Sequence, residues 1–317
     1  MTILIAEGMQ ESGIELFKKN KIKTLCLSDA YLKEEIEVLI VRSVFGVNEE
    51  ALRQFPNLKM VAKLGTGLDN IGQDFCAKRS IKVLSVPGLN AVSTAEFTVM
   101  QILNIYKNIF EISEKVKGRD FRRALYYGRE LVESEIMVIG YGSVGQNIVA
   151  RLKPFAKKIY ISDNHRKRHS EDDALQFVSD LNSEIVGCDV IVLALSLKNN
   201  EKMVNATFLS RLKKDVLLVN TARGGLIDEP ALCLFLKQNP RAFYYCDVLA
   251  LEPDYTKLPP EQDYCNPLLE LPNVLFTPHI AGMTKECQRN IALEIARKVI
   301  AEQNPLISES ELAHGRS

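Results

Sequence analysis

Ten short apolar segments recur along the chain and are separated by stretches with a helical pattern of apolar residues. Most of them are apolar at every position rather than at alternate positions, which is typical of strands buried on both faces of a parallel sheet. Strands that alternate with helices predict right-handed β-α-β units. We therefore expect an α/β fold with parallel sheets, whose strands lie at residues 3–6, 38–41, 60–64, 81–85, 136–139, 159–162, 190–194, 216–220, 243–248 and 274–277.

The strand segments fall into two groups, which suggests two sheets, and a length of 317 residues fits two domains. The groups divide near Ser93, where Ser93-Thr94-Ala95-Glu96 has the spacing of a capping box with Ser93 as the N-cap. We expect a long helix to follow it. The last helical pattern runs from Lys285 to about Gln303 and places apolar residues on one face.

The charged residues balance, because 40 Lys and Arg stand against 40 Asp and Glu. A nucleic-acid-binding protein usually carries a basic surplus or stripe, so we expect no nucleic-acid partner. No apolar run approaches the length of a membrane span, and the first residues lack the pattern of a secretory signal, so we expect no membrane association. The seven cysteines are scattered without a Cys-x-x-Cys pair, which favours free thiols in a cytoplasmic protein and argues against a metal site.

The second group of strands contains a glycine-rich turn with the sequence Gly140-Tyr141-Gly142-Ser143-Val144-Gly145. In such a turn Gly140 permits the tight bend, Gly142 lets the backbone approach a pyrophosphate, and Gly145 lets helix and strand pack closely. The helix that starts there presents free N–H groups to the phosphates. The next strand segment ends in Asp163, 18 residues after Gly145, which completes the Rossmann fingerprint of a dinucleotide site.

Asp163 bears on the choice between NAD and NADP. Its carboxylate can accept hydrogen bonds from both hydroxyls of the adenosine ribose, and it would repel a 2′-phosphate. The sequence therefore favours NAD as the cofactor. Against this, Arg166, Lys167 and Arg168 follow closely and can pair with such a phosphate, and the alternative is that they form a solvated basic turn.

Hydride transfer to a carbonyl leaves an alkoxide that needs a proton, and near neutral pH a histidine is the usual donor. The chain has four histidines, and three of them lie in the basic turn or near the end of the chain. The fourth, His279, directly follows an apolar strand segment, and ligands of open α/β sheets bind at the carboxyl ends of strands. Taken alone, His279 has a structural role as its alternative.

Two other strand segments have charged residues at or just after their carboxyl ends, namely Arg223 for one, and Asp247 and Glu252 for the next. Arg223 can hold a substrate carboxylate through two parallel hydrogen bonds. Glu252 can pair with His279 and favour its protonated form. Asp247 can reach the nicotinamide end of a cofactor. Each residue alone has a surface ion pair as its alternative, but together with the nucleotide turn they predict one shared active site.

At this point the chain resembles the D-isomer-specific 2-hydroxyacid dehydrogenase family over nearly its whole length. The resemblance implies two Rossmann-like or flavodoxin-like domains, with an NAD-binding domain at 94–283 inserted into a discontinuous substrate domain at 1–93 and 284–317. It also implies an active homodimer. The matching stretches are residues 65–71, 90–96, the glycine turn with Asp163, 220–229, 247–253 and 278–284.

The same resemblance assigns roles to individual residues. It implies a catalytic trio of Arg223, Glu252 and His279, in which Arg223 also binds the substrate. The residues expected to contact NAD are Thr66, Gly140, Gly142, Ser143, Val144, Gly145, Asp163, Thr221, Ala222, Asp247 and Gly282.

Residues 41–47 narrow the choice of substrate, because they look most similar to the phosphoglycerate dehydrogenase branch. In that branch the residue that matches Arg42 helps to hold the phosphate. The alternative for Arg42 is a structural role in the domain. No regulatory domain is expected after the last helix, so a smaller 2-oxoacid such as hydroxypyruvate or glyoxylate is the second hypothesis. Formate is disfavoured, because that branch has Gln where this chain has Glu252. A hypothesis of another class is a non-enzymatic, NAD-sensing scaffold like the corepressors that resemble this family, and the trio does not exclude it.

Overall fold

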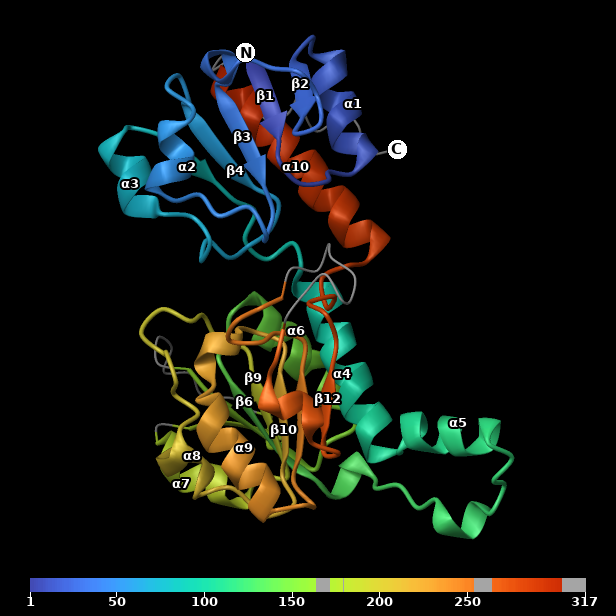
Figure 1. Cartoon of the computed structure of the whole chain (residues 1–317). Coiled ribbons are helices and arrows are strands. Elements are labelled where there is room, and N and C mark those ends of the chain that lie inside the picture. Colours follow the sequence, from blue (N-terminus) through green and yellow to red (C-terminus); the bar gives the residue numbers. More distant parts are fainter. Residues whose placement is uncertain (164–171, 179, 254–263, 304–317) are drawn as a thin grey trace. The chain divides into compact units, whose positions relative to one another are not determined.

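The structure is a computed structural model that describes residues 1–163, 172–178, 180–253 and 264–303. It divides into two compact units, a smaller one of Met1–Asn90 with Met283–Ser317 and a larger one of Ala91–Gly282. The divisions expected at 93 and 283 differ from these boundaries by three residues and by one. Each unit is built on a single parallel sheet (Figure 1).

The smaller unit has a five-stranded parallel sheet in the order β2-β1-β3-β4-β5, the flavodoxin-like order. Its strands are β1 (Thr2–Ile5), β2 (Lys23–Cys26), β3 (Val38–Val41), β4 (Met60–Lys63) and β5 (Lys82–Leu84). Its helices are α1 (Glu11–Lys19), η1 (Lys33–Glu35), α2 (Glu49–Arg53), α3 (Gln73–Lys78) and α10 (Lys285–Gln303).

Helices α1 and α10 pack side by side on one face of this sheet (Figure 1). A Cβ on Gly13 of α1 would lie 2.8 Å from the carbonyl oxygen of Ala292 in α10, so only glycine permits so close an approach. The residues of α10 that face the core include Ile291 and Ile295, which are buried. The expected last helix is therefore confirmed, and its apolar face completes a core built mainly from the first ninety residues.

The larger unit has a seven-stranded parallel sheet in the order β12-β11-β10-β9-β6-β7-β8. Its strands are β6 (Glu135–Ile139), β7 (Lys158–Ser162), β8 (Leu175–Val178), β9 (Val190–Leu193), β10 (Leu217–Asn220), β11 (Phe243–Cys246) and β12 (Val274–Phe276). Its helices are α4 (Ala91–Tyr106), α5 (Ile109–Lys117), η2 (Arg123–Leu125), η3 (Leu131–Glu133), α6 (Ser143–Leu152), α7 (Leu181–Glu184), η4 (Ile185–Gly187), α8 (Ala206–Leu209), η5 (Gly224–Leu226), α9 (Glu229–Gln238) and η6 (Pro267–Glu270).

This order is that of a doubly wound Rossmann sheet with one added strand, and the strand order reverses between β6 and β9. Successive residues of β6 alternate between two cores: Met137 and Ile139 pack on one face, and Ile136 and Val138 pack on the other. Both faces are therefore buried, which explains why the strand is apolar at every position. The predicted parallel α/β fold is confirmed.

All ten predicted strands are present, with ends that differ by at most two residues. Two strands, β2 and β8, were not predicted. Both lie at the edge of their sheet, and none of their residues is buried. An edge strand has little apolar surface to cover, so it lacks the continuous apolar run on which the prediction depended.

The predicted capping box at Ser93 is wrong. Helix α4 begins at Ala91, so Ser93 lies inside its first turn and is buried. Its hydroxyl donates a hydrogen bond to the carbonyl oxygen of Ala281, 2.7 Å away. The local pattern predicted that the Ser93 hydroxyl would bond to the backbone of its own helix. It bonds instead to a residue distant in the sequence.

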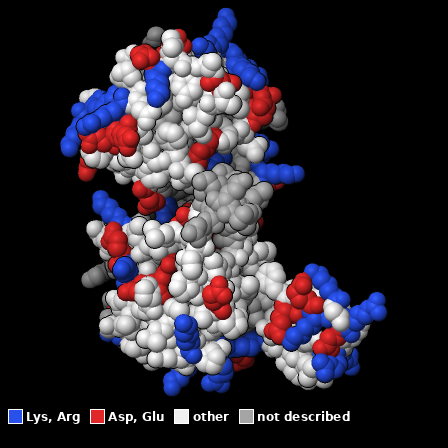
Figure 2. Space-filling view, viewed as in Figure 1, with Lys and Arg blue, Asp and Glu red and all other residues white. Residues whose placement is uncertain are grey.

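An arm, which we define as residues 109–127, extends from the larger unit and includes α5 (Figure 1). Basic and acidic side chains alternate on it (Figure 2), with ion pairs such as Lys115–Glu111 and Arg122–Asp120. Between these charges the arm exposes large apolar side chains, namely Ile109, Phe110, Val116, Phe121, Leu125 and Tyr127.

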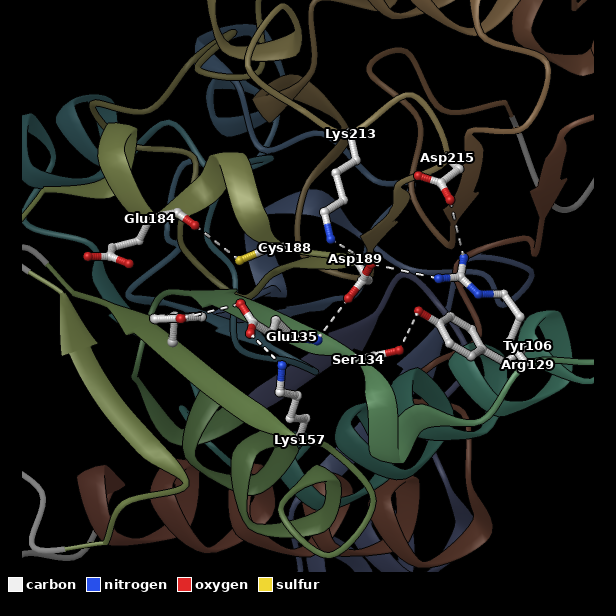
Figure 3. A network of polar contacts seen from close by, with 11 residues as sticks. Tyr106, Arg129, Ser134, Glu135, Lys157, Glu184, Cys188, Asp189, Lys213 and Asp215 are labelled. Carbon is white, nitrogen blue, oxygen red and sulfur yellow. Dashed lines mark hydrogen bonds and ion pairs between the residues drawn. The ribbon is translucent and has the colours of Figure 1, made fainter.

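A group of charged side chains joins the amino ends of β6, β9 and β10 (Figure 3), and we call it the amino-edge network. At its centre is Asp189, which accepts hydrogen bonds from the backbone N–H of Glu135 (2.9 Å) and from the Lys213 ammonium (2.8 Å). Arg129 lies 3.7 Å from Asp189 and 3.9 Å from Asp215, and its guanidinium covers the ring of Tyr106.

In the described part of the chain, no helix is both long and apolar enough to cross a membrane.

Candidate active site

The glycine turn joins β6 to α6 at the carboxyl edge of the seven-stranded sheet, where the strand order reverses. Gly140 has φ +99°, and a Cβ there would lie 2.4 Å from the carbonyl oxygen of Ala194. A Cβ on Gly145 would lie 2.0 Å from the carbonyl oxygen of Gly140. Both positions therefore require glycine, one for its backbone conformation and the other for helix–strand packing.

Gly142 differs from the other two glycines, because a Cβ there would meet no atom within 4 Å. It is the N-cap of α6, caps the helix without a side chain and lines a hollow in front of the turn. Ser143 is exposed and Val144 is partly buried in the first turn of α6. A helix N-terminus with room in front of it suits a pyrophosphate, whose charge the helix dipole and N–H groups stabilise.

A hollow extends from the glycine turn along the ends of β7 and β9 and is lined by Gly140, Gly142, Asp163, Ala194 and Asn200, among others. Asp163, which follows β7 directly, is half-buried at the wall of this hollow. These residues fit the adenosine half of a dinucleotide, with a carboxylate placed beside a phosphate-binding turn. The basic residues at 166–168, which were weighed against an NAD preference, lie outside the described residues.

Arg223 lies in the loop that follows β10, and Asn220 at the end of that strand shapes the loop. The Asn220 amide donates to the carbonyl oxygen of Arg223 (2.9 Å), and its Oδ1 accepts the N–H of Ala222 (3.1 Å). The Arg223 guanidinium is partly buried and donates to the carbonyl oxygen of Ala222 (2.7 Å). Thr221 is buried, and its hydroxyl shares a hydrogen bond of 2.8 Å with Thr98.

His279 and Glu252 come from two further strand-end loops and are in contact. The Nδ1 atom of His279 lies 2.9 and 3.0 Å from the two carboxylate oxygens of Glu252. The side chains of His279 and Glu252 are 38% and 27% exposed, so the pair is accessible to a small molecule. With Nδ1 held by a carboxylate, Nε2 is left to exchange a proton, which is the arrangement of an oriented general acid–base.

The backbone of His279 is strained, because its φ of 54° lies in the left-handed region, which is uncommon for residues other than glycine. Its N–H donates to the carbonyl oxygens of Asp247 (2.8 Å) and Thr277 (2.9 Å), which hold this conformation.

Asp247, predicted to contact the cofactor, is 1% exposed and holds the loop that carries His279. Its carboxylate accepts hydrogen bonds from the Thr277 hydroxyl (2.5 Å) and from the N–H groups of Ile280 (2.9 Å) and Ala281 (2.8 Å). Burial raises the pKa of Asp247 above its ordinary value, and these hydrogen bonds oppose that effect. Gly282, also predicted to contact NAD, is half-buried at the end of this loop.

Two predicted site residues, Arg42 and Thr66, belong to the smaller unit. The Arg42 guanidinium donates to the carbonyl oxygen of Gly8 (3.1 Å) and to the Gln288 side chain, and burial lowers its pKa. The Thr66 hydroxyl donates to the side chain of Asn90 (2.9 Å). Arg42 is thus bonded within its own unit, while its contact with a substrate phosphate stays a prediction.

The sequence analysis missed Glu7, which lies just after β1. Its carboxylate accepts hydrogen bonds from four consecutive backbone N–H groups, those of Arg42 (2.6 Å), Ser43 (3.1 Å), Val44 (2.8 Å) and Phe45 (3.1 Å). Glu7 therefore fixes the loop that carries Arg42. A carboxylate directly after a predicted strand, the signal that pointed to Asp163, was available for Glu7 as well.

In the described part of the chain no group of His, Cys, Asp and Glu has the geometry of a metal site. At the carboxyl edge of its sheet, the larger unit carries Arg223 and the pair of Glu252 and His279 after the neighbouring strands β10, β11 and β12. The glycine turn lies at the same edge, after β6. This set can bind a dinucleotide and an anionic substrate and can move a proton.

A family model described as "D-isomer specific 2-hydroxyacid dehydrogenase, NAD binding domain" matches residues 99–281, most of the larger unit. Among solved structures, the chain is similar to D-lactate dehydrogenase from Aquifex aeolicus, complexed with NAD and lactic acid. The TM-score is 0.84, the identity is 26%, and the match covers 99% of this chain and 98% of the other.

Curated relatives include the D-3-phosphoglycerate dehydrogenase of Archaeoglobus fulgidus, 32% identical over 95% of this chain and 57% of the relative. The hydroxypyruvate reductase of Thermotoga maritima is 32% identical over 84% of this chain and 85% of the relative. The chain spans somewhat more than half the length of the phosphoglycerate dehydrogenases that it matches, 57% to 59% for three of them.

Proposed function

Because the chain belongs to the D-isomer specific 2-hydroxyacid dehydrogenase family, we propose that it is an oxidoreductase that transfers a hydride between NAD(H) and C2 of a D-2-hydroxyacid. The observation that carries this proposal is the contact between Glu252 and Nδ1 of His279 on the sheet that bears the glycine turn. An acid–base pair beside a dinucleotide site is what reversible oxidation of an alcohol requires.

Nicotinamide, when bound, supplies or accepts the hydride. Arg223 binds the carboxylate of the substrate and polarises its carbonyl oxygen. Nε2 of His279 gives a proton to the oxygen that develops at C2 during reduction and takes it back during oxidation. Glu252 keeps the imidazole oriented and stabilises its protonated form. Asp247 holds the backbone from which His279 projects.

The turn at Gly140–Gly145 and the hollow beside it would hold the cofactor, with Asp163 on the adenosine ribose and Ser143 and Val144 at the phosphates. Asp163 favours NAD over NADP, because a carboxylate there would repel a 2′-phosphate. Thr66, Thr221, Ala222, Asp247 and Gly282 complete the proposed set of NAD contacts.

For the substrate we propose 3-phosphoglycerate first, because the relatives that align over most of this chain include several phosphoglycerate dehydrogenases. A specific observation favours a second candidate, hydroxypyruvate or glyoxylate. Arg42, the residue proposed to hold a phosphate, already donates to Gly8 and Gln288. The relatives also include a hydroxypyruvate reductase, and that match covers 84% of this chain and 85% of the relative.

Steady-state kinetics would test both levels of the proposal. Purified protein is mixed with NADH and a panel of 2-oxoacids that includes 3-phosphohydroxypyruvate, hydroxypyruvate, glyoxylate and pyruvate, and absorbance of the reduced nicotinamide is followed. A kcat/KM highest for the phosphorylated member supports the first candidate, and one highest for hydroxypyruvate or glyoxylate supports the second. If the protein bound NADH but turned over no member of the panel, the enzyme hypothesis would be wrong. The hypothesis of an NAD-sensing scaffold would then take its place.

We also propose a homodimer in the cytoplasm. The arm, with Phe121, Leu125 and Tyr127 between 60% and 78% exposed, offers apolar surface for a second copy. The seven cysteines are unpaired, as expected in a reducing compartment. Sedimentation equilibrium should give twice the chain mass, and Leu125→Asp should shift it toward the monomer. The matched control is Leu32→Asp, an equally exposed leucine of the smaller unit, and a monomeric wild type would end this proposal.

A further inference from the structure

Three loops at the carboxyl edge of the larger sheet follow neighbouring strands. They are residues 221–227 after β10, 247–253 after β11 and 277–282 after β12, and they carry Arg223, Glu252 and His279 in that order. Contacts between the second and third loops are part of the site described above. The contacts between the first and second loops have no role in the mechanism so far.

Glu229, the first residue of the helix α9 that follows the first loop, contacts the second loop. Its Oε1 accepts a hydrogen bond from the backbone N–H of Ala250 (2.9 Å), and its Oε2 accepts one from the Asn266 amide (3.0 Å). Both carboxylate oxygens are therefore used, and one of them fixes the backbone two residues before Glu252. A hydrogen bond to a carboxylate is among the stronger ones in proteins.

Gly224, the residue after Arg223, also contacts the backbone of this second loop. A Cβ on Gly224 would lie 1.9 Å from the carbonyl oxygen of Leu249, so the two backbones are in direct contact there. The segment from Gly224 to Glu229 thus meets the second loop at Leu249 and again at Ala250. From Ala250 the chain reaches Glu252, whose carboxylate lies against Nδ1 of His279.

We propose that Glu229 is a positioning residue that holds the 247–253 loop so that Glu252 stays against His279. The inference deepens the proposed function and depends on it for its kinetic part. Glu229 itself touches neither the substrate nor the reacting atoms. It acts on the proton transfer only through the backbone of Ala250 and the carboxylate of Glu252.

A purely structural role has to be distinguished, since a carboxylate in the first turn of a helix stabilises the helix wherever it is. The neighbouring Asp228 supplies the matched control. Asp228 is the N-cap of the same helix, and its side chain accepts the N–H of Ala231 (3.2 Å) without contacting the second loop. Asp228→Ala should lower the melting temperature and leave kcat and KM within about twofold, because only the helix cap is lost.

Glu229→Ala should lower kcat about tenfold, the size expected when an acid–base pair loses part of its orientation. The Kd for NADH should stay within about twofold, since the glycine turn is untouched. Glu229→Gln keeps an acceptor for the Ala250 N–H and should recover most of the lost kcat. In a Glu252→Gln background, Glu229→Ala should have almost no further effect on kcat, because residues that act through one another are not additive.

The NMR signal of the Nδ1–H proton of His279 gives a readout that does not depend on turnover. Its chemical shift reports the hydrogen bond to Glu252, so Glu252→Gln should move this resonance upfield. Glu229→Ala should move it in the same direction by a smaller amount, and Asp228→Ala should leave it in place. If the wild type turned over no 2-oxoacid, the proposed function would fail, and this resonance would still decide the role of Glu229.

Two results would overturn the inference. One is an unmoved Nδ1–H resonance of His279 in Glu229→Ala. The other is a fall in kcat on Glu229→Ala that is as large in the Glu252→Gln background as in the wild type.

Discussion

The two edges of the seven-stranded sheet use their charged residues in opposite ways. At the amino edge, Asp189 accepts from Lys213 and from the backbone of β6, and charge meets charge in a closed network (Figure 3). At the carboxyl edge, Asp247 and Glu229 accept hydrogen bonds from loop backbone, and the carboxylate of Glu252 lies against Nδ1 of His279. One edge joins strands to one another, and the other fixes loops in place.

The difference follows from the direction of the strands. In a parallel sheet the helices that follow the strands begin at the carboxyl edge, so their N–H groups and the loops before them gather there. Gly142 faces open space at that edge. At the amino edge Asp189, with a side chain 13% exposed, is enclosed by its partners. We therefore expect substitutions at the carboxyl edge to change activity and substitutions at the amino edge to change stability.

The largest expected effect is at the carboxyl edge. His279→Ala removes the proposed proton donor and should lower kcat by about 10²- to 10⁴-fold, the usual contribution of a general acid–base. Because the glycine turn is untouched, the Kd for NADH should change by less than about twofold. Stopped-flow or steady-state turnover with the best 2-oxoacid, together with fluorescence titration of NADH, measures both. Retained turnover would show that another group moves the proton.

At the amino edge, Asp189→Ala removes two hydrogen bonds to a carboxylate and leaves the N–H of Glu135 without that acceptor. The free energy of unfolding should fall by about 1.5–3 kcal/mol, as for hydrogen bonds to charged groups, while kcat/KM stays within about twofold. Urea unfolding measures the change. The control is Asp215→Ala, whose side chain is 44% exposed and 3.9 Å from Arg129, and which should cost about 0.5 kcal/mol or less. A loss of kcat without a loss of stability in Asp189→Ala would contradict the division between the edges.

Asp163 tests whether the carboxyl edge also sets cofactor choice. Asp163→Ala should lower kcat/KM with NADH and reduce the preference for NADH over NADPH by about tenfold or more, the size of one lost hydrogen bond to a charged group. The ratio of kcat/KM for the two cofactors is the measurement. An unchanged ratio would assign the preference to residues 166–168.

The smallest expected effect concerns Tyr160, whose hydroxyl donates to Glu135 at the amino edge (3.3 Å). Burial, and then the negative charge of Glu135, raise the pKa of Tyr160 to about 12. A raised tyrosine pKa contributes stability below the unfolded value near 10, and this stability is lost as the pH rises through about 12.

Glu135→Gln should lower the pKa of Tyr160, because it removes the negative charge that opposes the phenolate. Absorbance of the phenolate during a pH titration measures the change. Glu133→Gln, an exposed glutamate two residues earlier, is the matched control. If both variants behaved alike, a general change in charge rather than the contact with Tyr160 would be responsible.

The sequence was sufficient for features that depend on local pattern. Apolar runs located the strands that are buried on both faces, and glycine spacing located the turn at Gly140, whose φ of +99° only glycine adopts readily. The pairing of Glu252 with His279 was anticipated because both follow neighbouring strands. By contrast, β2 and β8 bury too little to leave an apolar run.

Contacts between a side chain and the backbone of a segment distant in the sequence were beyond prediction. Glu229 and Ala250 are 21 residues apart, and Ser93 and Ala281 are 188 apart. A side chain that bonds to a backbone N–H or carbonyl leaves no signature in the sequence of its partner, because every residue type has these groups. The engagement of Arg42 by Gly8 is of the same kind.

The left-handed backbone of His279 has a consequence for protein engineering. The proposed chemistry requires an imidazole at a position whose left-handed backbone conformation favours asparagine or glycine. A library screened only for heat resistance should therefore drift toward His279→Asn or His279→Gly, gaining robustness as it loses turnover. Such inactive variants would be useful for trapping a bound substrate, because the residues proposed to bind the cofactor are unchanged in them.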